Sequence, residues 1–311
     1  MAEVVLAVDI GGTKTAAALA DRNDVPLATL VAPTPAAEGA AAVIRTVIDL
    51  AEQLLAAADP DTRLVGVGIG TAGVVDTTRG MIVSATDTFA DWPGTRVADL
   101  VREGLGDSLP AGAPIAVQND VDAHAFGEFT HGAAAGASSA LIVAVGTGVG
   151  AGIVLGGQPL RGAHHVGGEI AHMPVPGAEH LRCPCDRMGH LEAIGSGIGL
   201  YNHFVSLGGD PAVVNARGVA ARAAEDPIAA RAIADSAASV GRAIAGAATL
   251  LDPERVVVTG GVPNIGDAWW GPMLAAFRAE AIDALQNTPI LAGTLGDDAP
   301  LRGAAAAAWR N

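Results

Sequence analysis

The chain is short of cysteine, aromatic residues and positive charge. It holds two cysteines in 311 residues, which excludes a disulfide framework, and the two thiols stand too close along the chain to bridge well. Aromatic residues make up 3%, so the core must be built from aliphatic and small side chains. With 18 Lys and Arg against 33 Asp and Glu, the net charge is −15 and no basic patch is visible. This balance argues against nucleic acid or an anionic membrane as a partner.

Long apolar runs and a secretory leader are missing as well. No apolar stretch reaches about 20 residues without Gly, Pro or charge. The first residues, MAEVVLAVDIGG, lack the basic start and small-residue cleavage site of a signal peptide. We therefore expect a cytoplasmic protein that acts on a small molecule. Its length and its 50% of apolar residues allow two domains or one large one.

Strand-like runs that end in glycine occur three times. EVVLAVDIGG near the N-terminus leads into a second strand, and SALIVAVGTGVGAGIVLGG repeats the order of strand, turn and strand after residue 138. ERVVVTGGVP at 254–263 is the third. Amphipathic helices are expected at about 37–58 and just before residue 253. This order predicts two α/β domains on mixed sheets, with the glycine turns facing a shared cleft.

The glycine turns predict a nucleotide site. DIGGTKT at 9–15 places a carboxylate, able to hold water or magnesium, beside bare backbone amides that can approach phosphate oxygens. A Walker A loop is excluded, because GxxxxGK[ST] is absent. With GTGVGAG at 146–152 and TGG at 259–261, we expect terminal phosphates near 146–148 and adenosine near 260–261. The predicted nucleotide-binding residues are Asp9, Gly11, Gly12, Thr13, Lys14, Gly146, Thr147, Gly148, Gly260 and Gly261.

The segment QNDVDAH provides a candidate general base. Asp120 follows a predicted strand and precedes a helix, so its carboxylate should project at the edge of a sheet, with Asn119 beside it. There it can accept the proton of a sugar hydroxyl that attacks a γ-phosphate. The alternative is that Asp120 only caps the helix. Further along, GGEIAHM offers Glu169 and His172, whose side chains suit the hydroxyls of a neutral polyol.

Both cysteines lie in HLRCPCDRMGHLE at 180–192. Taken alone, this stretch leaves a metal site, a redox pair and a plain loop open. The ordered set of motifs is more specific, because it resembles the ROK family (repressors, open reading frames and sugar kinases). DIGGTKT is similar to that family's first phosphate motif, QND to its catalytic segment, VGTGVGAGIVLGGQPLRGAHHVGGEIAHM to its signature, CPCDRMGHLEA to its zinc segment and VVVTGGV to its adenosine motif.

The resemblance spans nearly the whole chain and implies a fold and an activity. The fold is the actin-like, hexokinase-like ATPase fold, with two α/β domains flanking a cleft. The implied domains are a small one, 1–118, joined by the C-terminal helix 302–311, and a large one, 119–301, which carries the zinc-bearing loop. The implied activity is an ATP- and Mg²⁺-dependent sugar kinase with a structural Zn²⁺, and family members are commonly dimers or tetramers, so a homo-oligomer is expected.

The resemblance also implies roles for single residues. Asp120 is the expected base, and the expected sugar contacts are Asn119, Glu169, His172 and Glu192. Zinc is expected on His172, Cys183, Cys185 and His190. The family usually reads CxCGxxGC, so His190 replaces a cysteine and Asp186 a glycine, and two Cys with two His are an acceptable zinc set. His180 is the alternative fourth ligand, and a metal-free loop is the alternative to zinc.

The sugar is harder to assign. Many glucokinases of the family carry APN[LI]xW after the GxVD turn, whereas this chain has SATDTFADWPGT at 84–95, with Thr86, Asp87 and Thr88 near the missing asparagine. N-acetylmannosamine is therefore narrowly favoured over glucose, and polyphosphate stays open as a donor. A sugar-responsive repressor is disfavoured, because the phosphate strand begins within the first residues, without a preceding helix-turn-helix domain, and the charge is acidic.

Overall fold

The computed structural model describes residues 2–85 and 88–310. Contacts divide the chain into two compact units, the first made of Met1–Gly136, Pro159–Gly167 and Thr294–Asn311, and the second of Ala137–Gln158 and Gly168–Gly293. The division at residue 118 stays a prediction; in the compact units, residues 119–136 group with the first. No helix among the described residues is both long and apolar enough to cross a bilayer.

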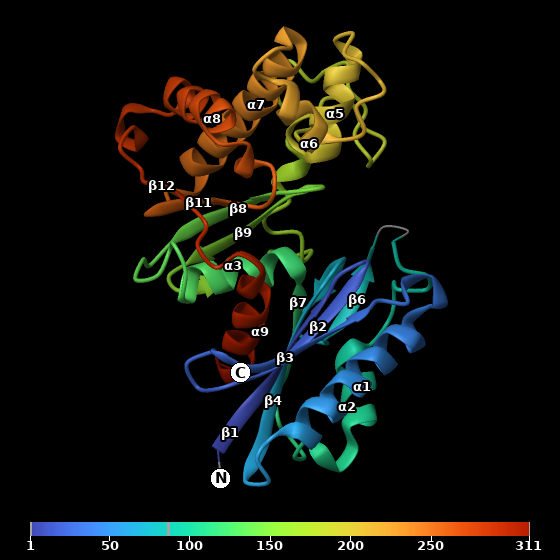
Figure 1. The fold of residues 1–311 in the computed structure, drawn as a ribbon. Coiled ribbons are helices and arrows are strands. Elements are labelled where there is room, and N and C mark those ends of the chain that lie inside the picture. The colour runs from blue at the N-terminus through green and yellow to red at the C-terminus, as the bar shows by residue number, and fades with distance from the viewer. Residues whose placement is uncertain (1, 86–87, 311) are drawn as a thin grey trace. The chain divides into compact units, whose positions relative to one another are not determined.

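A five-stranded mixed sheet, in the order β3-β2-β1-β4-β7, forms the centre of the first unit (Figure 1). Strand β1 is antiparallel to β2, whereas β1, β4 and β7 run parallel, so the carboxyl ends of these three lie at one edge. The strands are β1 Ala2–Ile10, β2 Lys14–Ala20, β3 Pro26–Pro33, β4 Thr62–Thr71 and β7 Ile115–Asn119. A small antiparallel pair joins β5 Val74–Asp76 to β6 Met81–Ser84.

Helices cover both faces of this sheet. The side chains of β1 alternate, so that Val4, Leu6 and Val8 pack with the buried faces of α1 and α2, while Val5 and Ala7 pack with α9 (Figure 1). The helices of this unit are α1 Ala40–Ala57, α2 Val97–Leu105, α3 Asp120–Thr130 and α9 Ala299–Arg310, with short 3₁₀ turns at Ala36–Glu38, Gly106–Ser108 and Gly296–Asp298. A sheet covered on both sides explains the nearly unbroken apolar runs of its central strands.

Helices α3 and α9 approach each other through glycines. A Cβ added to Gly303 on α9 would lie 1.8 Å from the Ala123 carbonyl oxygen on α3, and one added to Gly127 on α3 would lie 2.1 Å from the Ala299 oxygen. The two backbones are therefore in direct contact, and only glycine fits at these two positions. Helix α9 thereby fixes α3 to the first unit.

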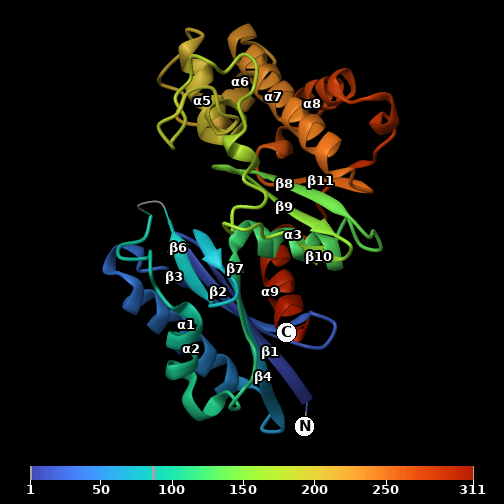
Figure 2. The ribbon, with the colours of Figure 1, turned by 180° about the vertical axis from the view of Figure 1, so that it is seen from behind.

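The second unit has its own five-stranded sheet, in the order β10-β9-β8-β11-β12, with its helices gathered on one face (Figure 2). Its strands are β8 Ala140–Val145, β9 Val149–Leu155, β10 Gln158–Pro159, β11 Arg255–Thr259 and β12 Ile290–Ala292. Its helices are α4 Glu192–Gly195, α5 Gly197–Ser206, α6 Ala216–Arg222, α7 Pro227–Leu251 and α8 Asp267–Glu280, with 3₁₀ turns at Ile170–His172, Pro263–Ile265 and Asp283–Leu285. Buried Phe204, Trp269 and Phe277 supply the few aromatic side chains of its otherwise aliphatic core.

The elements that the sequence predicts are confirmed where they carry strong patterns. The three glycine turns follow β1, β8 and β11, and the helix expected at 37–58 is α1, preceded by a 3₁₀ turn. Helix α7 is the helix expected just before residue 253. It begins at Pro227, because Asp226 caps it by accepting hydrogen bonds from the backbone N–H groups of Ile228 and Ala229.

The close approach of α3 and α9 generates a stability prediction. Gly303→Ala should lower the free energy of unfolding by about 3 kcal/mol, because the new methyl group meets backbone rather than a movable side chain. Gly246→Ala is the matched control: a Cβ added to this helical glycine of α7 would lie 3.5 Å from the Met173 Cε, an ordinary contact, so the change should be neutral or stabilising by up to about 1 kcal/mol. Urea denaturation measures both, and equal stability of the two variants would contradict the packing argument.

Candidate functional site

The first glycine turn joins β1 to β2 at residues 11–13. The Gly11 N–H donates to the Lys14 carbonyl oxygen at 3.0 Å, which closes the turn. A Cβ on Gly12 would lie 2.7 Å from the Thr88 methyl group, so this turn passes close to the segment that we expect near the sugar. Thr86 and Asp87 of that segment lie outside the described residues. The Lys14 ammonium is 3.8 Å from an Asp297 oxygen, and both side chains are exposed, so this weak pairing leaves the lysine free to meet an anion.

The predicted base Asp120 is the first residue of α3, directly after β7. Asn119, rather than Asp120, is the helix cap: its Oδ1 accepts from the N–H groups of Val121 at 2.9 Å and Asp122 at 3.4 Å. Its Nδ2 donates to the Gly73 carbonyl oxygen at 2.9 Å. One Asp120 oxygen accepts from the Val121 N–H at 3.0 Å. The capping interpretation of this segment therefore applies to the asparagine, and Asp120 is the first residue inside the helix.

Asp9 and Asp120 share one electrostatic environment at the carboxyl ends of β1 and β7. Burial raises the pKa of Asp9 to about 6, and the negative charge of Asp120 adds to this rise, while Lys14 opposes it. Burial also raises the pKa of Asp120, against weaker effects of its hydrogen bonds to backbone N–H groups and to Asn119. Carboxylates that bind protons more tightly than usual suit proton transfer near neutral pH.

Gly70 keeps the space between these carboxylates open. It lies on β4 opposite Asp9 in the sheet register. A Cβ added there would lie 2.8 Å from the Ala123 Cβ, 3.7 Å from the Asp120 Cα and 3.8 Å from an Asp9 oxygen. Sequence reasoning missed this residue, although the glycine-interleaved strand GVGIGTAG that contains it was visible.

In the second unit, the other two glycine turns come together. The Gly197 N–H donates to the Gly146 carbonyl oxygen at 2.8 Å, and the Val262 N–H donates to the Val145 carbonyl oxygen at 3.0 Å. Gly260 has φ of +100°, and a Cβ there would lie 2.4 Å from the Val145 oxygen, so glycine is required. The turn after β8 and the turn after β11 are therefore parts of one structure.

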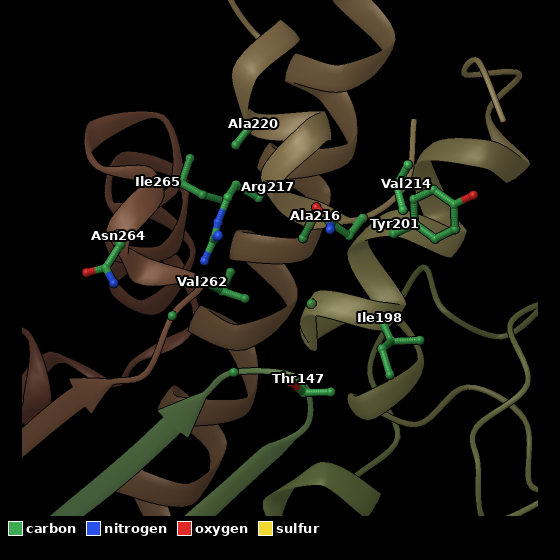
Figure 3. A pocket seen from close by; sticks show the side chains of 14 residues that line it. Thr147, Ile198, Tyr201, Val214, Ala216, Arg217, Ala220, Val262, Asn264 and Ile265 are labelled. Atoms are coloured by element: carbon green, nitrogen blue, oxygen red, sulfur yellow. The ribbon is translucent and has the colours of Figure 1, made fainter. Parts of the chain in front are cut away.

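A cavity of about 700 Å³ opens beside these two turns (Figure 3). Of the residues predicted to bind the nucleotide, Gly146, Thr147 and Gly261 contribute to its lining, whereas Gly148 and Gly260 do not. The rest of the wall, which sequence reasoning missed, comes from α5, from α6 and the residues just before it, and from the 3₁₀ turn Pro263–Ile265. Its main side chains are Ile198, Tyr201, Val214, Arg217, Asn264 and Ile265. A largely apolar cavity with a few polar groups is typical of a site for a heterocyclic base. No motif in the sequence marks α6 as part of a binding site.

The predicted sugar contacts of the second unit lie close to one another. His172 Nε2 is 3.7 Å from a Glu169 oxygen, on the 3₁₀ turn that begins after Glu169. Glu192 starts α4, and its Oε2 accepts from the Val149 N–H at 2.7 Å, at the end of the turn 146–148. Burial raises the pKa of Glu192, the bond from Val149 lowers it, and the charge of Glu169 raises it. Glu192 thus holds the turn 146–148 with one oxygen. Phosphate binding by this turn and sugar binding by Glu192 stay predictions.

His172, Cys183, Cys185 and His190 form a cluster whose ligand atoms all lie within 4.8 Å of one another. The Cys185 sulfur is 3.2 Å from His190 Nδ1, and the Cys183 sulfur is 3.8 Å from His172 Nδ1. Ligand atoms around a tetrahedral zinc stand roughly 3.3 to 3.8 Å apart, so this set fits the ion with small adjustments. His180 is not in the cluster; its ring lies 6.3 Å from that of His203.

The backbone of this loop accommodates both departures from the family pattern. Asp186 has φ of +67°, the left-handed conformation that glycine adopts most easily and that Asp tolerates better than most residues. Its N–H donates to the Cys183 carbonyl oxygen at 2.9 Å, and the Cys183 N–H donates to the Arg187 carbonyl oxygen at 2.8 Å. This tight turn points both cysteines into the cluster.

Similarity to known proteins extends over nearly the whole chain. The model of the ROK family matches residues 5–311. The bifunctional enzyme NanE/NanK of Brucella melitensis is 34% identical over 97% of this chain and 53% of its own length. The crystal structure of a ROK hexokinase from Thermus thermophilus is 32% identical, with a TM-score of 0.85 over 99% of this chain and 98% of that one. A ROK glucokinase from Streptomyces griseus, in complex with glucose and AMPPNP, is 29% identical, with a TM-score of 0.76 over 99% and 100%.

The raised pKa of Asp9 generates a prediction for stability. Because the folded state holds the Asp9 proton up to about pH 6, ionisation of this group destabilises the protein as the pH rises from about 4 to 6. Asp9→Asn removes that cost, so above pH 6 its free energy of unfolding should exceed that of the parent by on the order of 2 kcal/mol. The difference should vanish towards pH 4.

Urea titrations at pH 4, 6 and 8 measure this effect. Asp49→Asn, on the exposed face of α1, is the control and should follow the parent curve. Equal stability of Asp9→Asn and the parent at pH 8 would contradict the electrostatic argument.

Proposed function

The chain belongs to the ROK family and is a sugar kinase, and from that premise we propose that it transfers the γ-phosphate of ATP to the 6-hydroxyl of N-acetylmannosamine. The observation that carries the proposal is the partly buried Asp120 carboxylate, which stands at the start of α3 directly after β7, acts electrostatically on Asp9 and has a raised pKa. In the proposed step, Asp120 accepts the proton of the sugar hydroxyl as its oxygen attacks the γ-phosphorus. The bond from that phosphorus to the β–γ bridging oxygen breaks, and ADP leaves.

The proposed roles of the other groups in the first unit follow from their charge. The amides of Gly11 and Gly12 and the exposed Lys14 ammonium would bind phosphate oxygens. Asp9 would hold Mg²⁺, which neutralises charge on the phosphates when bound. The carboxylate fits a cation, because burial and the charge of Asp120 make its ionisation unfavourable until a positive charge is supplied.

In the second unit, we assign the adenosine to the cavity beside Gly146 and Gly261. Arg217 on α6 is an exposed guanidinium on the wall of that cavity (Figure 3). A guanidinium can stack on a purine or bond to ribose hydroxyls, so it is a suitable contact for the nucleoside. The turn 146–148, braced by Glu192, would meet the phosphates.

A zinc ion on His172, Cys183, Cys185 and His190 would have a structural role, because four protein ligands leave no open position for chemistry. His172 turns Nδ1 to the cluster and Nε2 to Glu169, so the carboxylate would orient the ligand from outside. The ion would therefore fix Glu169, His172 and Glu192, which are the proposed contacts of the sugar hydroxyls. The thiols are proposed as metal ligands, not as a redox pair.

Two features support N-acetylmannosamine. The glucokinase asparagine is missing from the segment 84–95, and the relative with a NanK part, a name given to N-acetylmannosamine kinase, is 34% identical. Glucose is the second candidate, favoured by the Streptomyces griseus glucokinase, which matches this chain from end to end. ATP is the proposed donor, and the proposed assembly is a homo-oligomer.

A substrate panel tests the proposal. With ATP, the highest kcat/KM among N-acetylmannosamine, N-acetylglucosamine, mannose and glucose should belong to N-acetylmannosamine, and polyphosphate should support slower turnover than ATP. A coupled ADP assay measures the first and sugar phosphate formation the second. The highest kcat/KM with glucose would reject the sugar assignment but not the kinase. Asp120→Asn is the control for mechanism, with kcat expected to fall by about 10² to 10⁴; retained turnover would reject Asp120 as base.

Metal analysis tests the proposed zinc site. The purified protein should hold one zinc per chain, His190→Ala should lose it, and His180→Ala should keep it, because His180 lies outside the cluster. Loss of the ion should lower Tm by at least about 5 °C and raise the KM for sugar. His190→Cys, which restores the usual family ligand, should keep the metal. A protein without stoichiometric zinc, or an unchanged zinc content in His190→Ala, would reject the site.

A further inference from the structure

Glu128 is a fully buried carboxylate on α3, two turns after Asp120. Its Oε2 accepts from the Ala133 N–H at 2.9 Å, and its Oε1 accepts from the N–H groups of Thr294 and Leu295, both at 2.9 Å. A Cβ on Gly132 would lie 2.0 Å from Oε2, so the neighbouring residue must be glycine for the carboxylate to reach. A buried charge is costly unless it is fully hydrogen-bonded, and here backbone N–H groups meet that need.

The partners of Glu128 lie where the chain passes between the two units. Ala133 comes three residues before the first unit ends at Gly136, and Thr294 and Leu295 are the first two residues after the chain returns. The two oxygens of one carboxylate thus hold the departing and the returning segment. After Leu295 the chain continues through the turn Gly296–Asp298 into α9, which packs against α3.

The remaining passage, Pro159–Gly167, is held at the other end of α3. The Arg161 guanidinium donates to the Gln118 side-chain oxygen at 2.6 Å and pairs with the Asp122 carboxylate. These two partners stand on either side of Asn119 and Asp120 in the sequence. Gln118 is itself buried, and its Nε2 donates to the Gly303 carbonyl oxygen on α9 at 3.4 Å.

We propose that Glu128 and Arg161 are positioning residues that fasten every segment passing between the two units to the helix bearing Asp120. Movement of the second unit is then transmitted to the junction of β7 and α3, so that the base is placed when substrates are bound. Residues that absorb such movement affect kcat and KM together, although they touch no substrate. The inference rests on the proposed role of Asp120 as base.

Two variants test it, with the best sugar of the panel and ATP as substrates. Glu128→Gln keeps the shape but turns an amide NH₂ towards a backbone donor, and Arg161→Met keeps the length but removes both polar contacts. In each, kcat should fall by about tenfold or more, because small misplacement of a reacting group is costly, and the KM values for sugar and ATP should both rise. Arg161→Lys keeps the positive charge but lacks the planar guanidinium that contacts two partners, so its kcat should lie between those of Arg161→Met and the parent.

Hydrogen–deuterium exchange supplies a readout independent of activity. Exchange should be faster at 133 and 294–295 in Glu128→Gln, and at 159–167 in Arg161→Met. Arg102→Met is the matched control, because Arg102 also ties two segments, by a 2.6 Å bond to the Ala113 carbonyl oxygen, but both lie well inside the first unit. Its kinetic constants should equal those of the parent.

Parent values of kcat and both KM in a folded Glu128→Gln or Arg161→Met protein, even with faster exchange, would show a merely structural role and overturn the proposal. If Glu128→Gln does not fold, Arg161→Met decides, since its ion pair is partly exposed and its loss is tolerable. Asp120→Asn distinguishes failure of the proposed base from failure of the proposed positioning role. If Asp120→Asn stays active, Asp120 is not the base. If it is inactive while the Glu128 and Arg161 variants keep the parent kinetics, only the positioning role is rejected.

Discussion

The mutual repulsion of Asp9 and Asp120 in a poorly solvated place is the constraint around which the first unit is arranged. Two parallel strands, β1 and β7, end there with β4 between them, and Gly70 on β4 leaves the intervening space unfilled. Burial raises the pKa of both carboxyls, and the charge of Asp120 raises that of Asp9 further. Ionisation of these carboxylates therefore lowers the stability of the folded state, and the surrounding packing must offset that cost. A bound cation would offset this excess of negative charge and so favour the ionised carboxylates.

The packing that holds Asp120 in place is unusually direct. Helix α3 meets α9 through Gly127 and Gly303 with backbones in contact, which leaves little freedom for the helix to shift. Asn119 ends β7, caps α3 and also donates a hydrogen bond to Gly73. This one residue therefore links β7, the start of α3 and the turn between β4 and β5. In the segment QND the asparagine thus builds the helix start, and the role proposed for the aspartate is proton transfer.

Sequence reasoning reached the parts of this fold that repeat a local pattern. Apolar runs ending in glycine predicted the turns after β1, β8 and β11, and the four cysteine and histidine side chains predicted for zinc do come together. It did not predict that α6 lines the cavity or that Glu128 is a buried, hydrogen-bonded carboxylate, because each depends on contacts between distant segments. In the sequence, Glu128 looks like an ordinary residue on the surface of a helix. Only the structure shows that the backbone N–H groups of residues 294 and 295, more than 160 positions later, donate hydrogen bonds to its carboxylate.

The same lesson applies to the departures from the family pattern in the cysteine loop. In the sequence, Asp186 and His190 are two separate departures from the family pattern, whereas in the structure one loop conformation accommodates both. Asp186 keeps the left-handed backbone conformation that a glycine would supply, and this turn leads the chain back so that His190 Nδ1 stands beside the Cys185 sulfur. Histidine reaches further from the backbone than cysteine, so the substitution needs a loop that places its Cα farther from the metal. What is selected in such a site is the position of four donor atoms, and more than one set of side chains can provide it.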